Sequence, residues 1–317
     1  MARARAGWDD FFFSPVGPTD LCAGRAIFFS LAFAYYVTQD FSEWGTVAPE
    51  FWMPIALFKV LGLPLASPGA IVAIETIWKA ALGLAAIGLW TRAAMVVSFV
   101  CATYLLGLPH NFGQTQHFDT LTVLVFGILA FSRAGDAWSV DAWRRRARGM
   151  ATTARSPEYR WPIRAIWVTA SLIFFAAGVS KLRHSGLTWI FSDHLAILLI
   201  RHQYFVSDGE PLTAWGPIIA SYPWAARTLA AIAILTETLY PLSLFSRRAR
   251  LLLVPGGIGF LIGIRLLMGP TFESFVMCNV FWVPWEFVFR LLPVRTASVA
   301  IDPHPPLTGV PIRPPQR

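Results

Sequence analysis

Charged residues are scarce in this 317-residue chain. Asp, Glu, Lys and Arg make up only 14% of it, and 56% of the residues are hydrophobic, whereas soluble domains carry about a quarter charged residues. So few charges could not cover a surface exposed to water, which excludes an ordinary soluble domain. The composition therefore predicts a protein whose solvent is the lipid bilayer.

Cysteine is also rare, and its pattern excludes two further classes. Cys22, Cys101 and Cys278 each lie in or beside an apolar segment, with no CxxC pair, so neither a disulfide framework nor a thiolate metal site is indicated. The N-terminus lacks the apolar stretch and small-residue cleavage site of a signal peptide. The net charge of +8 does not indicate nucleic acid, because the arginines lie in loops between apolar runs, where they set topology.

Eight apolar runs are long enough, or nearly so, to cross roughly 30 Å of hydrocarbon. They are Leu21–Thr38, Ala70–Trp90, Ala93–Leu108, Gly113–Ser132, Ile163–Lys181, Trp224–Ser246, Leu251–Met268 and Thr271–Leu292. With a cytoplasmic N-terminus, eighteen of the 26 Lys and Arg residues fall on the cytoplasmic side and five on the other, which satisfies the positive-inside rule. We expect a multi-pass protein of the cell inner (plasma) membrane with both termini in the cytoplasm.

Two outer segments, Asp40–Ser67 and Arg183–Pro223, are too long and too apolar to be plain loops. The second contains GLTWIFSDHLAILLIRHQYF, which suits an interfacial or re-entrant helix covering the bundle. The fold class is therefore all-α: a polytopic bundle of about eight transmembrane helices with interfacial or re-entrant helices on the extracytoplasmic side. Residues 1–20 form a cytoplasmic N-terminal segment, 21–292 the transmembrane domain and 293–317 a Pro-rich cytoplasmic tail.

Ionisable residues inside the spans need a reason, because each costs at least a few kcal/mol unless it is paired or hydrated. His117 and Asp119 lie in the polar outer half of the fourth span, and Lys181 ends the fifth at the same level, after the small residues of AAGVSKL. A Lys181 side chain that the small residues bury would be a neutral amine and a base. The alternative is a snorkelling cation that marks the end of the span.

Four further charges lie within the spans. Glu75 and Lys79 are four residues apart, which predicts a mutual ion pair with a structural role. Glu237 and Arg265 lie in the sixth and seventh spans, where they could pair across helices or bind an anionic group of a substrate. The histidines of the outer segment, His202 among them, lack the spacing of a metal site, and no metal is expected.

Several motifs, taken in order, resemble the HTTM domain, the transmembrane module of vitamin K-dependent gamma-carboxylases, in a bacterial form without the lumenal C-terminal domain. The resemblance covers nearly the whole chain. The matching pieces are PTDLCAGRAIFF (18–29), GLWTRAAMVV (88–97), QHFDTL with WSVDAW (138–143), AAGVSKL (176–182), Trp189, and Arg201 with His202.

The resemblance implies a quinol-dependent membrane enzyme. Lys181 matches the family's base, which deprotonates reduced vitamin K or menaquinol, with Ser180 in place of the preceding Lys. Gln116 and His117 match an Asn-His pair. The deprotonated quinol would react with O2 to give a strong base that removes a glutamate γ proton before CO2 adds. We expect Lys181 and His117 to be catalytic, and Gln116, Asp119, Ser180, Trp189, Arg201, His202, Glu237 and Arg265 to line the cavity.

Two departures leave a second function open. The 317 residues include no counterpart of the large lumenal domain that binds the substrate propeptide, and Arg265 stands where the carboxylases have a His. The alternative is a non-catalytic membrane protein that assists maturation or export of a secreted peptide, with the polar mouth as its docking site. A transporter has no support, since no repeated halves or matched broken helices are present. The expected partners are membrane lipid, a lipid-soluble quinone and a secreted peptide or protein, with no nucleic acid.

Overall fold

The computed structural model is all-helical in the parts of the chain that it describes, residues 2–113, 118–150, 154–204 and 210–291. Within those ranges the extended backbone pairs only at one isolated bridge, between Val16 and Ser156. The all-α prediction is therefore confirmed. Gln116 and His117, as well as the expected Pro-rich tail, lie outside the described residues.

Within the described residues, four helical segments are long and apolar enough to cross a membrane. They are α4 (Pro68–Ile87), α5 (Thr91–Leu105) continued by η3 to Phe112, α8 (Trp161–Ser185) with the η4 turn from Pro157 before it, and α14 (Arg247–Leu267). Each coincides with one of the expected spans. Capping chemistry fixes several of their ends: Ser67 and Ser246 accept N-cap hydrogen bonds from Ala70 and Ala249, and Gly88 ends α4 with a φ of 74°.

The other expected spans are less apolar, shorter or broken. They correspond to α2 (Thr19–Tyr36), α6 (Thr120–Ala130), α12 (Pro223–Leu239) with α13 (Leu242–Phe245), and α15 (Glu273–Cys278) with η5 (Asn279–Trp282) and α16 (Trp285–Leu291). The last of these is interrupted because Pro284 disfavours a helical residue before it, and Val283 is extended with a ψ of 127°. Apolar composition predicted this segment but not its breaks.

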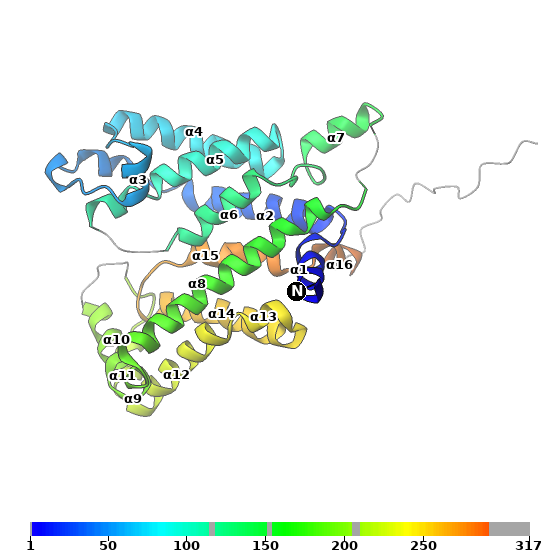
Figure 1. Cartoon of the computed structure of the whole chain (residues 1–317). Coiled ribbons are helices and arrows are strands. Elements are labelled where there is room, and N and C mark those ends of the chain that lie inside the picture. The colour runs from blue at the N-terminus through cyan, green and yellow to red at the C-terminus, as the bar shows by residue number, and fades with distance from the viewer. Residues whose placement is uncertain (1, 114–117, 151–153, 205–209, 292–317) are drawn as a thin grey trace, which may run out of the picture.

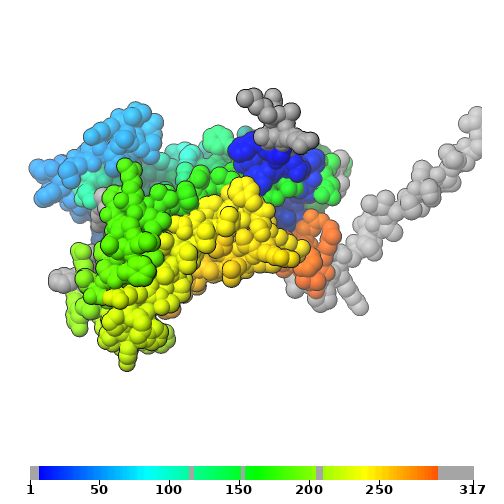
Figure 2. Space-filling view, turned by 60° about the horizontal axis from the view of Figure 1, so that its bottom comes forward, coloured from blue at the N-terminus to red at the C-terminus, as the bar shows by residue number. Residues whose placement is uncertain are grey.

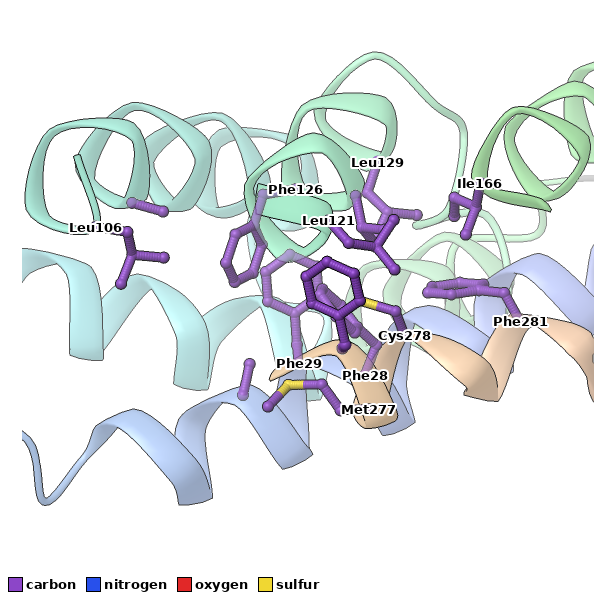
Figure 3. Close-up of a cluster of buried hydrophobic side chains, with 14 of the residues drawn as sticks. Phe28, Phe29, Leu106, Leu121, Phe126, Leu129, Ile166, Met277, Cys278 and Phe281 are labelled. Carbon is purple, nitrogen blue, oxygen red and sulfur yellow. The ribbon is translucent and has the colours of Figure 1, made fainter. Parts of the chain in front are cut away.

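The helices form two groups joined at the centre. One group contains α2, α4, α5 and α6, and the other contains α8, α12 and α14; α6 contacts α8, and α15 contacts α2, α6 and α14. Figure 1 shows α15 between the two groups, and Figure 2 shows the yellow segments that include α12 to α14 on the front face. The core at this junction contains Phe28, Phe126, Cys278 and Phe281 (Figure 3), all at most 2% exposed.

The short connecting elements gather at the two ends of the bundle. Figure 1 shows α3 (Ala56–Leu61), α9 (Thr188–Phe191), α10 (His194–Tyr204) and α11 (Trp215–Ala220) at one end, and α1 (Ala2–Phe13), α7 (Val140–Ala147) and α16 at the other. Short 3-10 turns complete the connections: η1 (Ser42–Thr46), η2 (Pro49–Phe51), η3 (Pro109–Phe112) and η4 (Pro157–Tyr159). The expected outer helix is thus two helices, α9 and α10, separated at Ser192 and Asp193.

A buried arginine fastens the second of these ends. Arg25 on α2 is 0% exposed, and its guanidinium donates to the carbonyls of Ala85 and Ala86 at the end of α4 and of Ala134, Ala137 and Trp138 before α7. Carbonyls at a helix end have no partner within the helix, so this one side chain satisfies acceptors from two segments. We name this group the Arg25 corner.

Candidate functional site

The close approach of α8 and α12 prepares the site. A Cβ added to Gly178 on α8 would lie 2.7 Å from Cγ2 of Thr238 and 3.0 Å from Cβ of Glu237 on α12. Those distances are too short for any side chain, so only glycine permits the two backbones to approach this closely. The sequence prediction that small residues before Lys181 serve close helix approach is consistent with this contact.

Lys181 and Glu237 form an ion pair between these helices. The Lys181 Nζ lies 2.7 Å from both carboxylate oxygens of Glu237. The Glu237 side chain is 4% exposed and that of Lys181 is 23% exposed. The carboxylate therefore has little access to water and needs Lys181 as its partner, whereas the Lys181 amine can also reach water. The Lys181 amine is nonetheless bound to Glu237 and is not free in this structure.

The pair lies in the wall of an apolar cavity of ≈ 580 Å³. The walls come from α8, from the outer helices α9 and α10, from α12 and from α14 with the segment after it. Besides Lys181 and Glu237, the lining includes Phe118, Ile173, Phe174, Ala176, Ala177, Ser180, Trp189, Leu195, Leu198, Ala233, Phe260, Leu261, Ile264, Met268, Pro270, Phe272 and Phe275. An apolar cavity of this size with a few convergent polar groups is typical of small-molecule sites.

Trp189 supplies a second polar group to this wall. Its ring centroid lies 5.6 Å from the Lys181 Nζ, within cation–π range. Its indole N–H is buried and has no hydrogen-bond partner among the residues that the structure describes. A buried donor without an acceptor is costly, so this N–H favours a ligand that brings an oxygen acceptor into the cavity.

Four of the expected site residues, Lys181, Ser180, Trp189 and Glu237, are thus brought together. Gln116 and His117 lie outside the described residues. Asp119 lies elsewhere: it accepts a 2.6 Å hydrogen bond from the Tyr36 hydroxyl and ties α6 to α2.

The remaining expected residues also lie away from the lining. Arg201 is exposed on α10, and His202 donates from Nδ1 to the Leu198 carbonyl, 2.9 Å away in its own helix. Arg265 pairs with Glu273 at 3.0 Å and donates to the carbonyls of Glu210 and Gly269.

Arg265 and Glu273 belong to a second cavity, of ≈ 740 Å³, between α2, α14 and the broken segment α15 to α16. Leu261 and Phe272 line both cavities, so the two are adjacent. The sequence left open an Arg265–Glu237 pair, and the geometry assigns the two residues to different partners and different cavities. Apart from Trp189, sequence reasoning missed the aliphatic and aromatic lining, because in an apolar chain such residues look the same as core residues.

The lysine–glutamate pair of α4 shows what a structural pair looks like in this protein. Lys79 Nζ lies 2.5 Å from Glu75, as the four-residue spacing predicted. Lys79 also donates to the Gln39 carbonyl, and Glu75 accepts from the Phe41 backbone N–H. This pair fastens the chain after α2, and neither residue lines the two cavities described above.

In the part of the chain that the structure describes, no three His, Cys, Asp or Glu side chains are placed to hold a metal ion.

The chain was compared with known proteins in three ways. No protein-family model matches it, no curated protein matches it, and no solved structure matches it. Its function has to be argued from the residues that line the cavity.

Proposed function

We propose that this chain is a membrane enzyme similar to the vitamin K-dependent gamma-carboxylases, which binds reduced vitamin K or menaquinol beside the Lys181–Glu237 pair. The observation that carries the proposal is the position of that pair in the wall of an apolar cavity. Buried charges within membrane helices mark functional sites more often than they stabilise the fold. The motif resemblance independently points to the same lysine.

We also propose that the chain crosses the membrane eight times, with both termini in the cytoplasm of a cell whose inner (plasma) membrane holds it. The four long apolar helices would supply four crossings, and α2, α6, α12 with α13, and α15 to α16 the others. In support, α1 and α16 lie at the same end of the bundle, as an even number of crossings requires (Figure 1). The arginine-bearing α7 lies at that end and the apolar α9 to α11 at the other, which agrees with the positive-inside rule.

The cavities fit an isoprenoid quinol. The aromatic and aliphatic walls of the first cavity suit a fused aromatic ring, and Lys181, Glu237 and the Trp189 indole provide donors and acceptors for a ring oxygen. The adjacent second cavity, reached past Leu261 and Phe272, is lined mostly by apolar side chains and suits the isoprenoid tail. When bound, the quinol would supply two reducing electrons and an ionisable hydroxyl to react with O2, with CO2 as a co-substrate if the enzyme carboxylates.

The role of the chain's own residues is to move a proton. Transfer of a proton from the Lys181 ammonium to Glu237 gives a neutral amine and a neutral carboxylic acid. In an apolar wall this removes two charged groups that would otherwise need solvation. The amine then accepts the proton of a ligand hydroxyl at Nζ. The resulting ammonium lies beside the negative charge left on the ligand oxygen, and the 5.6 Å contact with Trp189 holds it there. His117 would orient the ligand or stabilise its anion, as the resemblance implies.

The test is O2 consumption and quinone epoxide formation by the purified full chain in nanodiscs with reduced menaquinone. We expect the parent to form epoxide and Lys181→Ala and Glu237→Gln to lose about 100-fold or more of the rate, the usual contribution of a positioned acid–base group. Lys79→Ala is the matched control, because it removes the lysine of the other ion pair without touching the cavity. Equal rates for the parent and both site variants would overturn the proposal.

A second function is favoured by one observation. Both oxygens of Glu237 bind Lys181, so the pair is complete without any ligand, as a purely structural pair would be. If the parent is inert with every quinol tried, and Lys181→Ala changes only stability, the chain is better described as a non-catalytic accessory protein for the maturation or export of a secreted peptide.

A further inference from the structure

Three arginines meet at the end of the bundle opposite the cavity-covering helices. Arg160 and Arg164 lie at the start of α8, and Arg250 lies in the first turn of α14. Both helices are long and both begin here, so the positive ends of two helix dipoles add to the three side-chain charges. We name these residues the Arg164 cluster.

Aromatic rings hold two of the guanidinium groups in place. The Arg164 guanidinium carbon lies 4.6 Å from the ring centroid of Phe11 and 4.2 Å from that of Trp167. That of Arg250 lies 4.3 Å from the Trp167 centroid. Trp167 is itself fixed by a 2.8 Å hydrogen bond from its indole nitrogen to the Phe281 carbonyl. Guanidinium groups held through ring contacts keep N–H groups free for a planar or tetrahedral anion.

The cluster has more positive charge than the chain neutralises. No ion pair within the described residues includes Arg160, Arg164 or Arg250; their hydrogen bonds there go to the backbone carbonyls of Phe11, Ser243 and Leu244. The Arg164 Nη1 is buried and has no hydrogen-bond partner in the described part of the chain. A buried donor among three like charges calls for an anion from outside the chain.

We propose that the Arg164 cluster binds the phosphodiester headgroup of an anionic phospholipid. The surroundings identify the source of the phosphate as a lipid, because strongly exposed apolar side chains flank Arg250. Phe245 is 81% exposed, Leu251 70% and Leu252 74%, and these side chains are placed to contact acyl chains next to a bound headgroup. Basic pockets between transmembrane helices at the membrane interface bind such headgroups.

The experiment compares phosphatidylglycerol, phosphatidylcholine and inorganic phosphate as additions to the full chain in detergent, with bound lipid counted by native mass spectrometry and stability followed by Tm. We expect phosphatidylglycerol to be retained and to raise Tm, and Arg164→Gln to weaken its binding about tenfold, since a charge-assisted hydrogen bond to phosphate is lost. Arg250→Gln is a second variant that leaves Arg164 in place. Arg92→Gln is the control, because Arg92 is an exposed arginine at the start of α5 and lies outside the cluster.

Three results would overturn the proposal. Equal retention of the two lipids, or an equal effect of Arg164→Gln and Arg92→Gln, would show that no specific headgroup site exists. A Tm increase with inorganic phosphate that phosphatidylglycerol does not exceed would assign the cluster to a free anion and refute the lipid. The readouts are binding and stability, so they are independent of any quinol chemistry at Lys181.

Discussion

The Lys181–Glu237 pair allows a prediction that separates stability from chemistry. Lys181→Met would leave the Glu237 carboxylate, 4% exposed, without its cation, and should destabilise the fold by about 3–5 kcal/mol. Glu237→Leu leaves the ammonium of a side chain that is 23% exposed, which can move towards water, so the expected cost is smaller, about 1–3 kcal/mol. The double variant removes both charges and should lie within about 1 kcal/mol of the parent.

The α4 pair provides the matched control for this cycle. Its side chains are buried to a similar degree, 22% exposed for Lys79 and 10% for Glu75. There, however, the double replacement Lys79→Met with Glu75→Leu also leaves the Phe41 N–H and the Gln39 carbonyl without their hydrogen-bond partners. We expect that double variant to stay destabilised by about 1–3 kcal/mol for each group left without a partner.

The assay is reversible unfolding in mixed micelles, with the free energy of unfolding measured for the parent, the single variants and the double variant of each pair. We expect a coupling energy of at least about 3 kcal/mol at Lys181–Glu237, the sum of the two single costs less that of the double variant, together with loss of the proposed quinol oxidation in the stable double variant. If the costs of the two single variants simply add, Lys181 and Glu237 do not stabilise each other. If the stable double variant still oxidises quinol, the pair has no chemical role.

Three further predictions concern the rest of the fold. Arg25→Lys should destabilise by about 2–6 kcal/mol, because three donors on a flexible amine cannot serve five carbonyls and at least two are left buried without a donor; thermal unfolding beside Arg92→Lys measures this. Burial raises the pKa of Asp141, but hydrogen bonds from Thr91 and the neighbouring backbone outweigh that effect and hold the pKa below its ordinary value. Its stabilising contribution is therefore complete at neutral pH and lost as the pH falls through that lowered pKa, a dependence that Asp141→Asn should abolish in unfolding measured against pH. Gly178→Leu should separate α8 from α12 and disrupt the ion pair, which cross-linking of cysteines placed on the two helices would detect as slower bond formation.

The sequence predicted interactions within a helix and missed those between helices. The spacing of Glu75 and Lys79 identified their ion pair because four residues make one turn. Lys181 and Glu237 are 56 residues apart in the chain, and no local periodicity relates them. Their contact depends on how α8 and α12 pack at Gly178, which is a property of the tertiary fold.

The sequence predicted apolar helices best where they are continuous. The four helices that could cross a membrane, α4, α5, α8 and α14, each correspond to an expected apolar run, as a backbone facing hydrocarbon would require because it must satisfy its own hydrogen bonds. The Thr271–Leu292 run includes Glu273, Asn279 and Pro284, and its first part, α15 with η5, packs between the two helix groups, where Phe275 and Cys278 are buried. There the Asn279 side chain donates to the Phe275 and Val276 carbonyls. Composition cannot distinguish lipid from protein as the apolar neighbour, so it could not predict the breaks.

The motifs behind the carboxylase resemblance lie at different places in the structure, and these places bear differently on function. Arg25 of the first motif donates to Trp138 of WSVDAW. Asp141 of WSVDAW accepts from the backbone N–H and the hydroxyl of Thr91 in GLWTR.

These three motifs thus contact one another at the end of the bundle farthest from α9 and α10 (Figure 1). Their side chains cap a helix and donate hydrogen bonds to backbone carbonyls. A protein could keep them for its fold with any activity or none. The resemblance therefore bears on chemistry through AAGVSKL, Trp189 and the QHFDTL piece, whose Phe118 lines the cavity. A variant at Lys181 tests the function, whereas a variant at Arg25 tests only the fold.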